Sequence, residues 1–143
     1  MYYNIKRIIL PYLTDSDPMW EQIGSEEVIC AFNAFSRKDW DNFISEIPAG
    51  AEDTDSEMID CLTQIGSPRA ISAAARIAVS ADEGGLSLFV MRLRGEDYSK
   101  ADTADLVEIE KRAARLAAEL SGPFAESFKR SLDRMRTHLC TVR

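Results

Sequence analysis

Hydrophobic residues recur at helical spacing along most of the chain. Trp40, Phe43, Ile44 and Ile47 follow the i, i+3, i+4, i+7 pattern of one helix face. The same spacing occurs in four further stripes: Met58–Leu62–Ile65, Ile71–Ala74–Ala75–Ala78, Leu106–Ile109–Ala113–Leu116–Leu120, and Phe124–Phe128–Leu132–Met135–Leu139. Residues 2–13 and 20–35 are also predicted to be helical, with breaks near Pro18 and Gly24. The pattern predicts an all-α protein.

Residues 86–94, LSLFVMRLR, are the ambiguous segment. Their run of bulky residues is compatible with a strand, but Leu86, Phe89, Val90 and Leu93 also fit one helix face. A lone strand would have no partner elsewhere in the chain, so a helix is favoured.

Short connections are indicated at Pro48-Ala49-Gly50, Gly66-Ser67-Pro68, Gly84-Gly85, Gly95 and Gly122-Pro123. Capping boxes are predicted where Ser36 precedes Asp39 and where Thr54 precedes Glu57. The longer loop at residues 49–57 is acidic and is expected to be exposed.

The tetrapeptide Gln-Ile-Gly-Ser occurs at residues 22–25 and again at 64–67, a spacing of 42. The register continues, since Ile29 aligns with Ile71, Ala31 with Ala73 and Phe35 with Ile77. A weaker third copy is residues 120–125, Leu-Ser-Gly-Pro-Phe-Ala. A period near 42 is typical of two-helix repeat units.

Residues 65–71, Ile-Gly-Ser-Pro-Arg-Ala-Ile, resemble the turn between the two helices of HEAT-type repeats. Gly66 suits the left-handed end of one helix, Ser67 suits the cap of the next, and Pro68 suits its first turn. The resemblance implies a short, irregular stack of antiparallel helix pairs, HEAT- or armadillo-like, with about 7–9 helices. It covers residues 61–79 well and 19–47 weakly, because Glu26 and Glu27 replace the Pro and Arg there.

The chain has 143 residues and is 45% hydrophobic, which predicts a single domain over residues 1–143. It contains no apolar run of transmembrane length, and its first residues do not resemble a signal peptide, so a cytoplasmic protein without a membrane partner is expected. Cys30, Cys61 and Cys140 are widely spaced and are interpreted as small buried or half-buried apolar residues.

Charge is distributed unevenly along the chain. Residues 1–110 hold 21 acidic and 9 basic side chains, whereas residues 111–143 hold 3 acidic and 8 basic ones. Residues 39–68 contain eight acids and no Lys or Arg. Such a surface repels phosphates and attracts basic partners, so nucleic acid is not an expected partner.

A basic group on the last helix, Lys129, Arg130, Arg134 and Arg136, has two interpretations. It is either a patch for an acidic partner or an intramolecular counterpart to the acidic front of the chain, and the second is favoured. Binding of nucleic acid by residues 129–136 is a minor alternative.

The sequence carries no motif that names a reaction, and no catalytic residue, metal site or cofactor is predicted. The only histidine, His138, is interpreted as a helix-end residue. Asp53, Asp55, Glu57 and Asp60 lack the spacing of a calcium loop. Acid–base catalysis by a pair such as Glu57 and Asp60 is retained as an alternative.

The function favoured by charge and architecture is non-catalytic protein binding. Small acidic domains of this kind resemble bacterial immunity proteins, which neutralise a basic toxin such as a nuclease. The alternative is a scaffold or adaptor that holds a peptide or helix in the groove of the stack. The alternative to a binding face is that the acidic residues are simply solvated. If Trp40 is partly exposed beside them, it is expected to be a binding hot spot. The predicted partner-binding residues are Asp39, Trp40, Asp41, Glu46, Glu52, Asp53, Asp55 and Glu57.

Overall fold

The computed structural model describes residues 25–45 and 55–142. These residues form seven α-helices and one 3-10 helix, and no strand occurs among them. The elements are α3 (Ser25–Asn33), α4 (Arg37–Ser45), α5 (Asp55–Ile65), α6 (Pro68–Ala78), α7 (Glu83–Arg92), η1 (Gly95–Lys100), α8 (Thr103–Glu119) and α9 (Pro123–Thr141). The all-helical prediction is confirmed, and residues 86–94 belong largely to helix α7.

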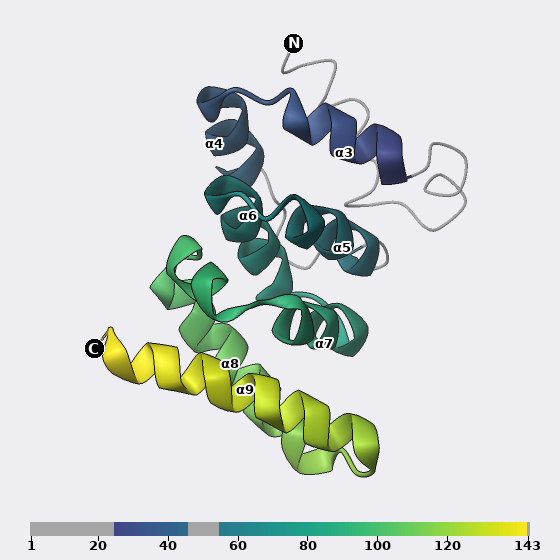
Figure 1. The fold of residues 1–143 in the computed structure, drawn as a ribbon, viewed down its shortest axis with the longest axis vertical. Helices are drawn as coiled ribbons and strands as arrows, with labels where there is room; N and C mark the ends of the chain where they lie inside the picture. The colour runs from purple at the N-terminus through teal and green to yellow at the C-terminus, as the bar shows by residue number, and fades with distance from the viewer. Residues whose placement is uncertain (1–24, 46–54, 143) are drawn as a thin grey trace.

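The helices stack in two layers (Figure 1). In one layer α3 packs on α5, α5 on α7, and α7 on α9. In the other, α4 packs on α6, and α6 on η1 and α8. Consecutive helices α5 and α6, and likewise α8 and α9, pack against each other across short turns. The predicted stack of helix pairs is therefore the observed architecture.

The turn between α5 and α6 forms as its residues predict. Gly66 has a φ of +70°, a left-handed conformation that is costly for residues with a side chain. Ser67 then accepts a hydrogen bond from the Ala70 N–H at 3.3 Å, and Pro68 occupies the first turn of α6. The third copy forms its turn differently, because Gly122 (φ +88°) is itself the N-cap of α9 and no side chain caps that helix, although Pro123 again occupies the first turn.

The first Gln-Ile-Gly-Ser copy lies almost wholly outside the described residues, and α3 begins at its last residue, Ser25. The predicted helix at residues 2–13, the breaks at Pro18 and Gly24, the turn at 48–50 and the Thr54 cap also lie outside them. Ile29 and Ala31 pack partly buried against the core, while their counterparts Ile71 and Ala73 are fully buried. Phe35 and its counterpart Ile77 are both buried, so the copies differ in burial at two of the three aligned positions.

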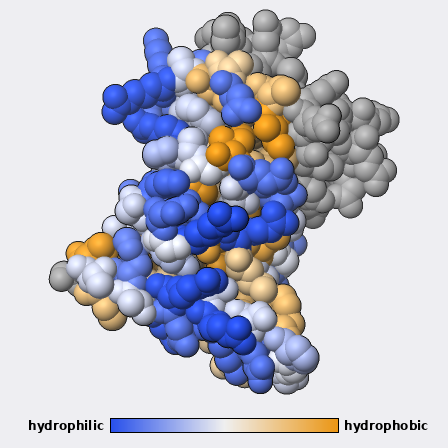
Figure 2. All heavy atoms as spheres, in the orientation of Figure 1, coloured by the Kyte–Doolittle hydropathy of each residue, from blue (hydrophilic) through white to orange (hydrophobic). Residues whose placement is uncertain are grey.

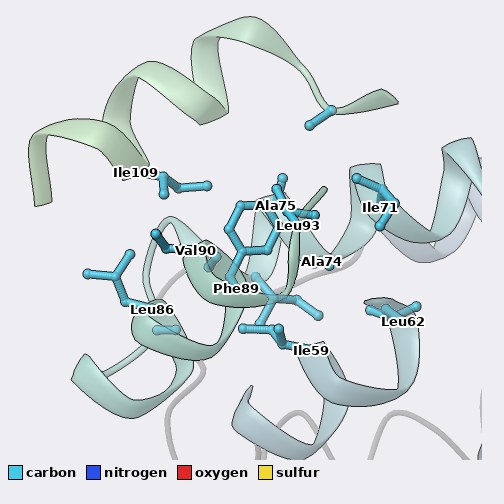
Figure 3. Close-up of a cluster of buried hydrophobic side chains, with 14 of the residues drawn as sticks. Ile59, Leu62, Ile71, Ala74, Ala75, Leu86, Phe89, Val90, Leu93 and Ile109 are labelled. Carbon is cyan, nitrogen blue, oxygen red and sulfur yellow. The ribbon is translucent and has the colours of Figure 1, made fainter. Parts of the chain in front are cut away.

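One contiguous hydrophobic cluster runs through the described helices, from Phe32 to Leu139. Figure 3 shows its centre, where side chains of α5, α6, α7 and α8 meet around Phe89. Each sequence stripe supplies buried members to this cluster. The small alanines of α6 let neighbouring helices approach closely, since α6 contacts elements of both layers.

Two basic side chains bind helix ends from elements further along the chain. Arg112 of α8 donates to the carbonyls of Ala78 and Val79, each at 2.9 Å, and to the carbonyl of Ala81 at 2.5 Å. Lys100 donates to the Gly66 carbonyl at 2.9 Å. A cation at a helix C-terminus satisfies free carbonyls and complements the helix dipole. These contacts therefore tie α5 to η1 and α6 to α8.

Two expectations were wrong. Gly84-Gly85 is not a connection, because both residues lie in the first turn of α7, whose cap is Asp82. Cys30 and Cys140 are exposed rather than buried or half-buried, and only Cys61 lies in the core. The glycine pair is compatible with either a turn or a helix start, and the cysteines with either a buried or an exposed helix face. In both cases the packing between helices decided the outcome.

Candidate functional site

The predicted binding residue Asp39 has a local structural role. Its N–H donates to Ser36 Oγ at 3.1 Å, and its Oδ2 accepts from the Ser36 N–H at 2.9 Å. This is the predicted capping box at the start of α4, and the residue is 8% exposed. Asp39 therefore stabilises the helix terminus and presents little charge to a partner.

Trp40 belongs to the core. Its ring stacks on Phe32 with centroids 5.2 Å apart, and it meets Phe35 edge-on at 4.9 Å. Phe43 completes this aromatic cluster between α3 and α4. Trp40 is 7% exposed, so the structure places it as packing rather than as an exposed hot spot.

Two acids of the segment are paired with bases on other helices. Asp41 of α4 meets Arg69 of α6 at 2.5 Å, and Asp60 of α5 meets Arg92 of α7 at 2.8 Å. Surface pairs of this kind add little stability, but they neutralise charge locally. Arg69 and Arg92 therefore neutralise two acids of the stretch 39–60, one near its beginning and one at its end.

The remaining predicted residues are described only in part. Glu46, Glu52 and Asp53 are outside the described residues, and so are the side chains of Asp55 and Glu57, whose backbone forms the first turn of α5. A methyl group placed on Gly84 would lie 3.6 Å from Ser56 Oγ, so the starts of α5 and α7 adjoin. Exposed Glu83 stands at the start of α7. The backbone at the start of α5 therefore adjoins the turn of α7 that carries Glu83.

An apolar groove begins beside Glu83. It lies between α7 and the turn that joins α8 to α9, and it encloses about 550 Å³. Its apolar lining consists of Leu88, Met91, Leu116, Leu120 and Phe124, with Glu83 and Arg92 among the polar lining residues. We call this feature the α7–α9 groove. In Figure 2 hydrophilic residues dominate the face over α9, with hydrophobic atoms at the edges of that band.

Sequence reasoning missed this groove. It assigned Leu120 and Phe124 to core stripes, but Phe124 is 48% exposed. A signal was nevertheless present in α7, where Leu88 and Met91 fall off the face made by Leu86, Phe89 and Val90. A helix with apolar residues on more than one face has a second surface to cover.

A polar cleft of about 360 Å³ lies beside the Gly66 turn, lined by Arg92, Arg94, Lys100, Glu96 and Asp97 among others. Two of these charged residues, Lys100 and Asp97, interact within the cleft. Lys100 pairs with Asp97 Oδ1 at 3.0 Å, and Asp97 Oδ2 accepts from the Arg94 N–H at 3.0 Å. Lys100 also donates to the Gly66 carbonyl, so the cleft residues hold η1 against this turn.

His138 lies in the last turn of α9, as predicted, but it has an aromatic neighbour. The rings of His138 and buried Tyr98 are 5.5 Å apart, and the Tyr98 hydroxyl donates to the Ser131 carbonyl at 3.5 Å. Burial raises the pKa of Tyr98 above its ordinary 10.0, although nearby Arg134 lowers it. The phenol therefore stays neutral at physiological pH and acts as a packed hydrogen-bond donor.

The basic residues of α9 are partly paired inside the molecule. Arg136 meets Glu110 of α8 at 2.7 Å and Asp133 of its own helix at 3.8 Å. Arg134 donates to Ser131 Oγ at 2.9 Å. Of the predicted basic group, Arg136 therefore pairs with α8, while Asp41 and Asp60 pair with bases of α6 and α7.

Among the described residues, no group of three or more His, Cys, Asp and Glu side chains is placed to hold a metal ion. Of the carboxylate pair in the catalytic alternative, Asp60 is paired with Arg92, and the side chain of Glu57 lies outside the described residues. None of the described helices combines the length and apolar character needed to cross a membrane.

No protein-family model, curated protein or solved structure matches this chain.

Proposed function

We propose that this protein is a non-catalytic binding module whose partner is a basic protein, in the manner of an immunity protein that occupies a toxin domain. The observation that carries the proposal is the run of acidic residues in the sequence that leads into α5. Glu46, Glu52, Asp53, Asp55 and Glu57 follow one another without an intervening base. Arg69 and Arg92 are already paired with Asp41 and Asp60, so they are not available to neutralise this segment.

The binding surface in this proposal is narrower than the predicted set of eight residues. Asp39 caps a helix, Trp40 packs in the core, and Asp41 is paired with Arg69. The segment 46–57 remains as the source of attraction for a basic surface. Complementary charge of this kind accelerates association and selects among partners.

The proposal includes a HEAT-like classification and a cytoplasmic location. The two-layer stack and the Gly66-Ser67-Pro68 turn support the first. The exposed thiols of Cys30 and Cys140 favour a reducing compartment.

The test is a matched pair of triple charge reversals. One variant carries Asp53→Lys, Asp55→Lys and Glu57→Lys; the control carries Glu96→Lys, Glu108→Lys and Asp133→Lys at exposed sites elsewhere. Each reversal adds two positive charges, so both variants go from a net charge of −7 to −1. Tagged protein would be purified from its native cells, and its stoichiometric partner identified and titrated.

We expect the first variant to bind the partner at least about tenfold more weakly, and the control to bind like the wild type at the same ionic strength. Affinity should fall as salt rises. Equal weakening of both variants would attribute binding to net charge alone. Unchanged affinity in the first variant would show that residues 46–57 form only a solvated surface.

A second candidate function is a scaffold that holds a peptide or helix. The α7–α9 groove favours it, because an apolar groove on a helical stack is the kind of surface that receives an amphipathic helix. This function differs from the first in not requiring the acidic segment.

A further inference from the structure

A further hollow lies between η1 and the C-terminal half of α9, the yellow helix of Figure 1. Its volume is about 360 Å³, within the range of roughly 300–1,000 Å³ that small-ligand sites occupy. We call this hollow the η1–α9 pocket. It is lined by Gly95, Tyr98, Arg134, Thr137, His138 and Thr141. Since η1 and α9 pack on each other, two helical elements of the fold build its walls.

The fixed charge that lines the η1–α9 pocket has one sign. Arg134 supplies a cation, and no Asp or Glu is among the lining residues. The Nη2 of Arg134 donates to Ser131 Oγ at 2.9 Å, which holds the guanidinium in place. No carboxylate in the described part of the chain pairs with Arg134, and its Nη1 and Nε donate to none of the described atoms. One edge of the guanidinium is therefore open to a ligand.

The acids that adjoin the pocket in sequence are directed elsewhere. Asp97 pairs with Lys100 at 3.0 Å, and Asp133 meets Arg136 at 3.8 Å. Glu96 lines the polar cleft beside the turn between α5 and α6. The negative end of the α9 dipole is also distant, because it acts mainly within the last turn, and residue 134 lies about two turns before the end of the helix. The cation is thus not neutralised by its surroundings.

Beside this cation the pocket has an aromatic wall. The rings of Tyr98 and His138 lie 5.5 Å apart with an interplanar angle of 30°. Tyr98 is 1% exposed and its hydroxyl donates to the Ser131 carbonyl, so its ring is fixed by the core. The His138 ring makes no hydrogen bond to a described residue, and a neutral or charged imidazole has an N–H to donate. The wall therefore offers a flat apolar surface with one free donor.

The two threonines add no donor to the pocket. Thr137 Oγ1 donates to the Asp133 carbonyl at 2.9 Å, and Thr141 Oγ1 donates to the His138 carbonyl at 2.7 Å. Both hydroxyl hydrogens are thus used within α9. Arg134 and His138 are therefore the side chains that can donate to a ligand.

We propose that the η1–α9 pocket binds a small carboxylate with a flat apolar body, its carboxylate on Arg134 and its body against the rings of Tyr98 and His138. A carboxylate matches the planar guanidinium, which donates two parallel hydrogen bonds to it. An inorganic anion would leave the aromatic wall uncovered, and a neutral aromatic compound would leave the cation unpaired. The proposal goes beyond the binding of a basic protein, since it uses no residue of segment 46–57.

The probe is benzoate, with acetate and benzamide as matched compounds. Acetate keeps the charge without the ring, and benzamide keeps the ring without the charge. His138 is the only histidine of the chain, so its imidazole gives a single set of signals in proton–carbon NMR spectra of the full-length protein. We expect benzoate to shift these signals saturably and to bind at least about tenfold more tightly than either matched compound, because only benzoate meets both the cation and the wall.

The decisive comparison is Arg134→Gln against Arg130→Gln. Arg130 is exposed one turn earlier on α9 and does not line the pocket, and each variant takes the net charge from −7 to −8. We expect Arg134→Gln to weaken benzoate binding at least about tenfold, as loss of a charge-assisted hydrogen bond does, and Arg130→Gln to bind like the wild type. Arg134→Lys keeps the charge without the fork and should lie between them. Circular dichroism confirms that each variant is folded.

Several results would overturn the proposal. Equal weakening by Arg134→Gln and Arg130→Gln would show that benzoate responds to net charge alone. Equal affinity for acetate or for benzamide would remove the role of the wall or of the cation. The absence of a saturable shift of the His138 signals in the wild type would show that the pocket holds no such ligand.

Discussion

Arg112 shows how one side chain can decide the end of another helix. Its guanidinium donates to three carbonyls at the end of α6, and two of their residues, Ala78 and Ala81, are buried. Buried carbonyls without a donor are costly, and hydrogen bonds from charged groups are among the stronger ones. Arg112 therefore carries more of the stability than its place on a charged helix indicates.

We predict that Arg112→Ala lowers the free energy of unfolding by about 3 kcal/mol, because several buried carbonyls lose their donor. Arg115→Ala is the control. It lies one turn further along α8, is exposed, and makes only a 3.5 Å contact with the Lys111 carbonyl, so a change below about 0.5 kcal/mol is expected. Urea denaturation of both variants checks this. Equal effects would show that the carbonyl contacts contribute no more than general helix propensity.

Between elements, the turn that leads from α6 into α7 depends on one missing methyl group. A Cβ on Gly85 would lie 2.9 Å from the Ala81 Cβ and 3.5 Å from Ile59 Cδ1 of α5. The first distance is too short for two methyl groups, and neither alanine nor the helix start can rotate away. The contact with Ile59 is an ordinary van der Waals distance, so Gly85 is required by the close approach of Ala81, in the turn between α6 and α7, to the first turn of α7.

We predict that Gly85→Ala destabilises the protein by about 1–3 kcal/mol through overpacking, despite the better helix propensity of alanine. Gly84→Ala is the neighbouring control. A Cβ there would meet only Asp82 Oδ1 and Ser56 Oγ, at 3.5 and 3.6 Å, so the same propensity gain should make it neutral or stabilising by up to about 1 kcal/mol. Thermal unfolding of the pair measures the difference, and stabilisation by both would contradict the packing argument.

At the scale of the molecule, the described helices contact mainly their neighbours in the stack. α4 packs on α6, and α6 on α8, while α9 packs on α7, α8 and η1. Such arrays distribute stability through successive interfaces, so a local loss need not be shared equally by the whole chain.

We predict that Phe128→Ala, which removes a fully buried ring of α9, costs about 3–5 kcal/mol and increases amide hydrogen exchange most in α7, α8 and α9. Phe43→Ala, a matched deletion in α4, should increase exchange most in α3, α4 and α6. If both variants show the same increase along the chain, the stack unfolds as one cooperative unit instead.

Much of the fold was predictable because it depends on local chemistry. The spacing of Trp40 and Phe43, the Ser36–Asp39 capping box and the Gly66-Ser67-Pro68 turn act within a few residues of themselves. The candidate site was less predictable. Asp41 and Asp60 were predicted to belong to an acidic face, but their partners Arg69 and Arg92 lie on other helices.

By itself, the sequence determined the described helices, the Ser36 cap, the Gly66-Ser67-Pro68 turn and the uneven charge, since each follows from periodicity, backbone preference or composition. The stacking of helix pairs was implied by the resemblance of that turn to helical repeats. The tertiary structure alone decided that Trp40 is buried, that Phe124 is exposed and that Gly85 lies inside a helix at a close contact. It also decided which acids are paired. These outcomes depend on which helix faces meet, and that is a property of packing between segments distant in the chain.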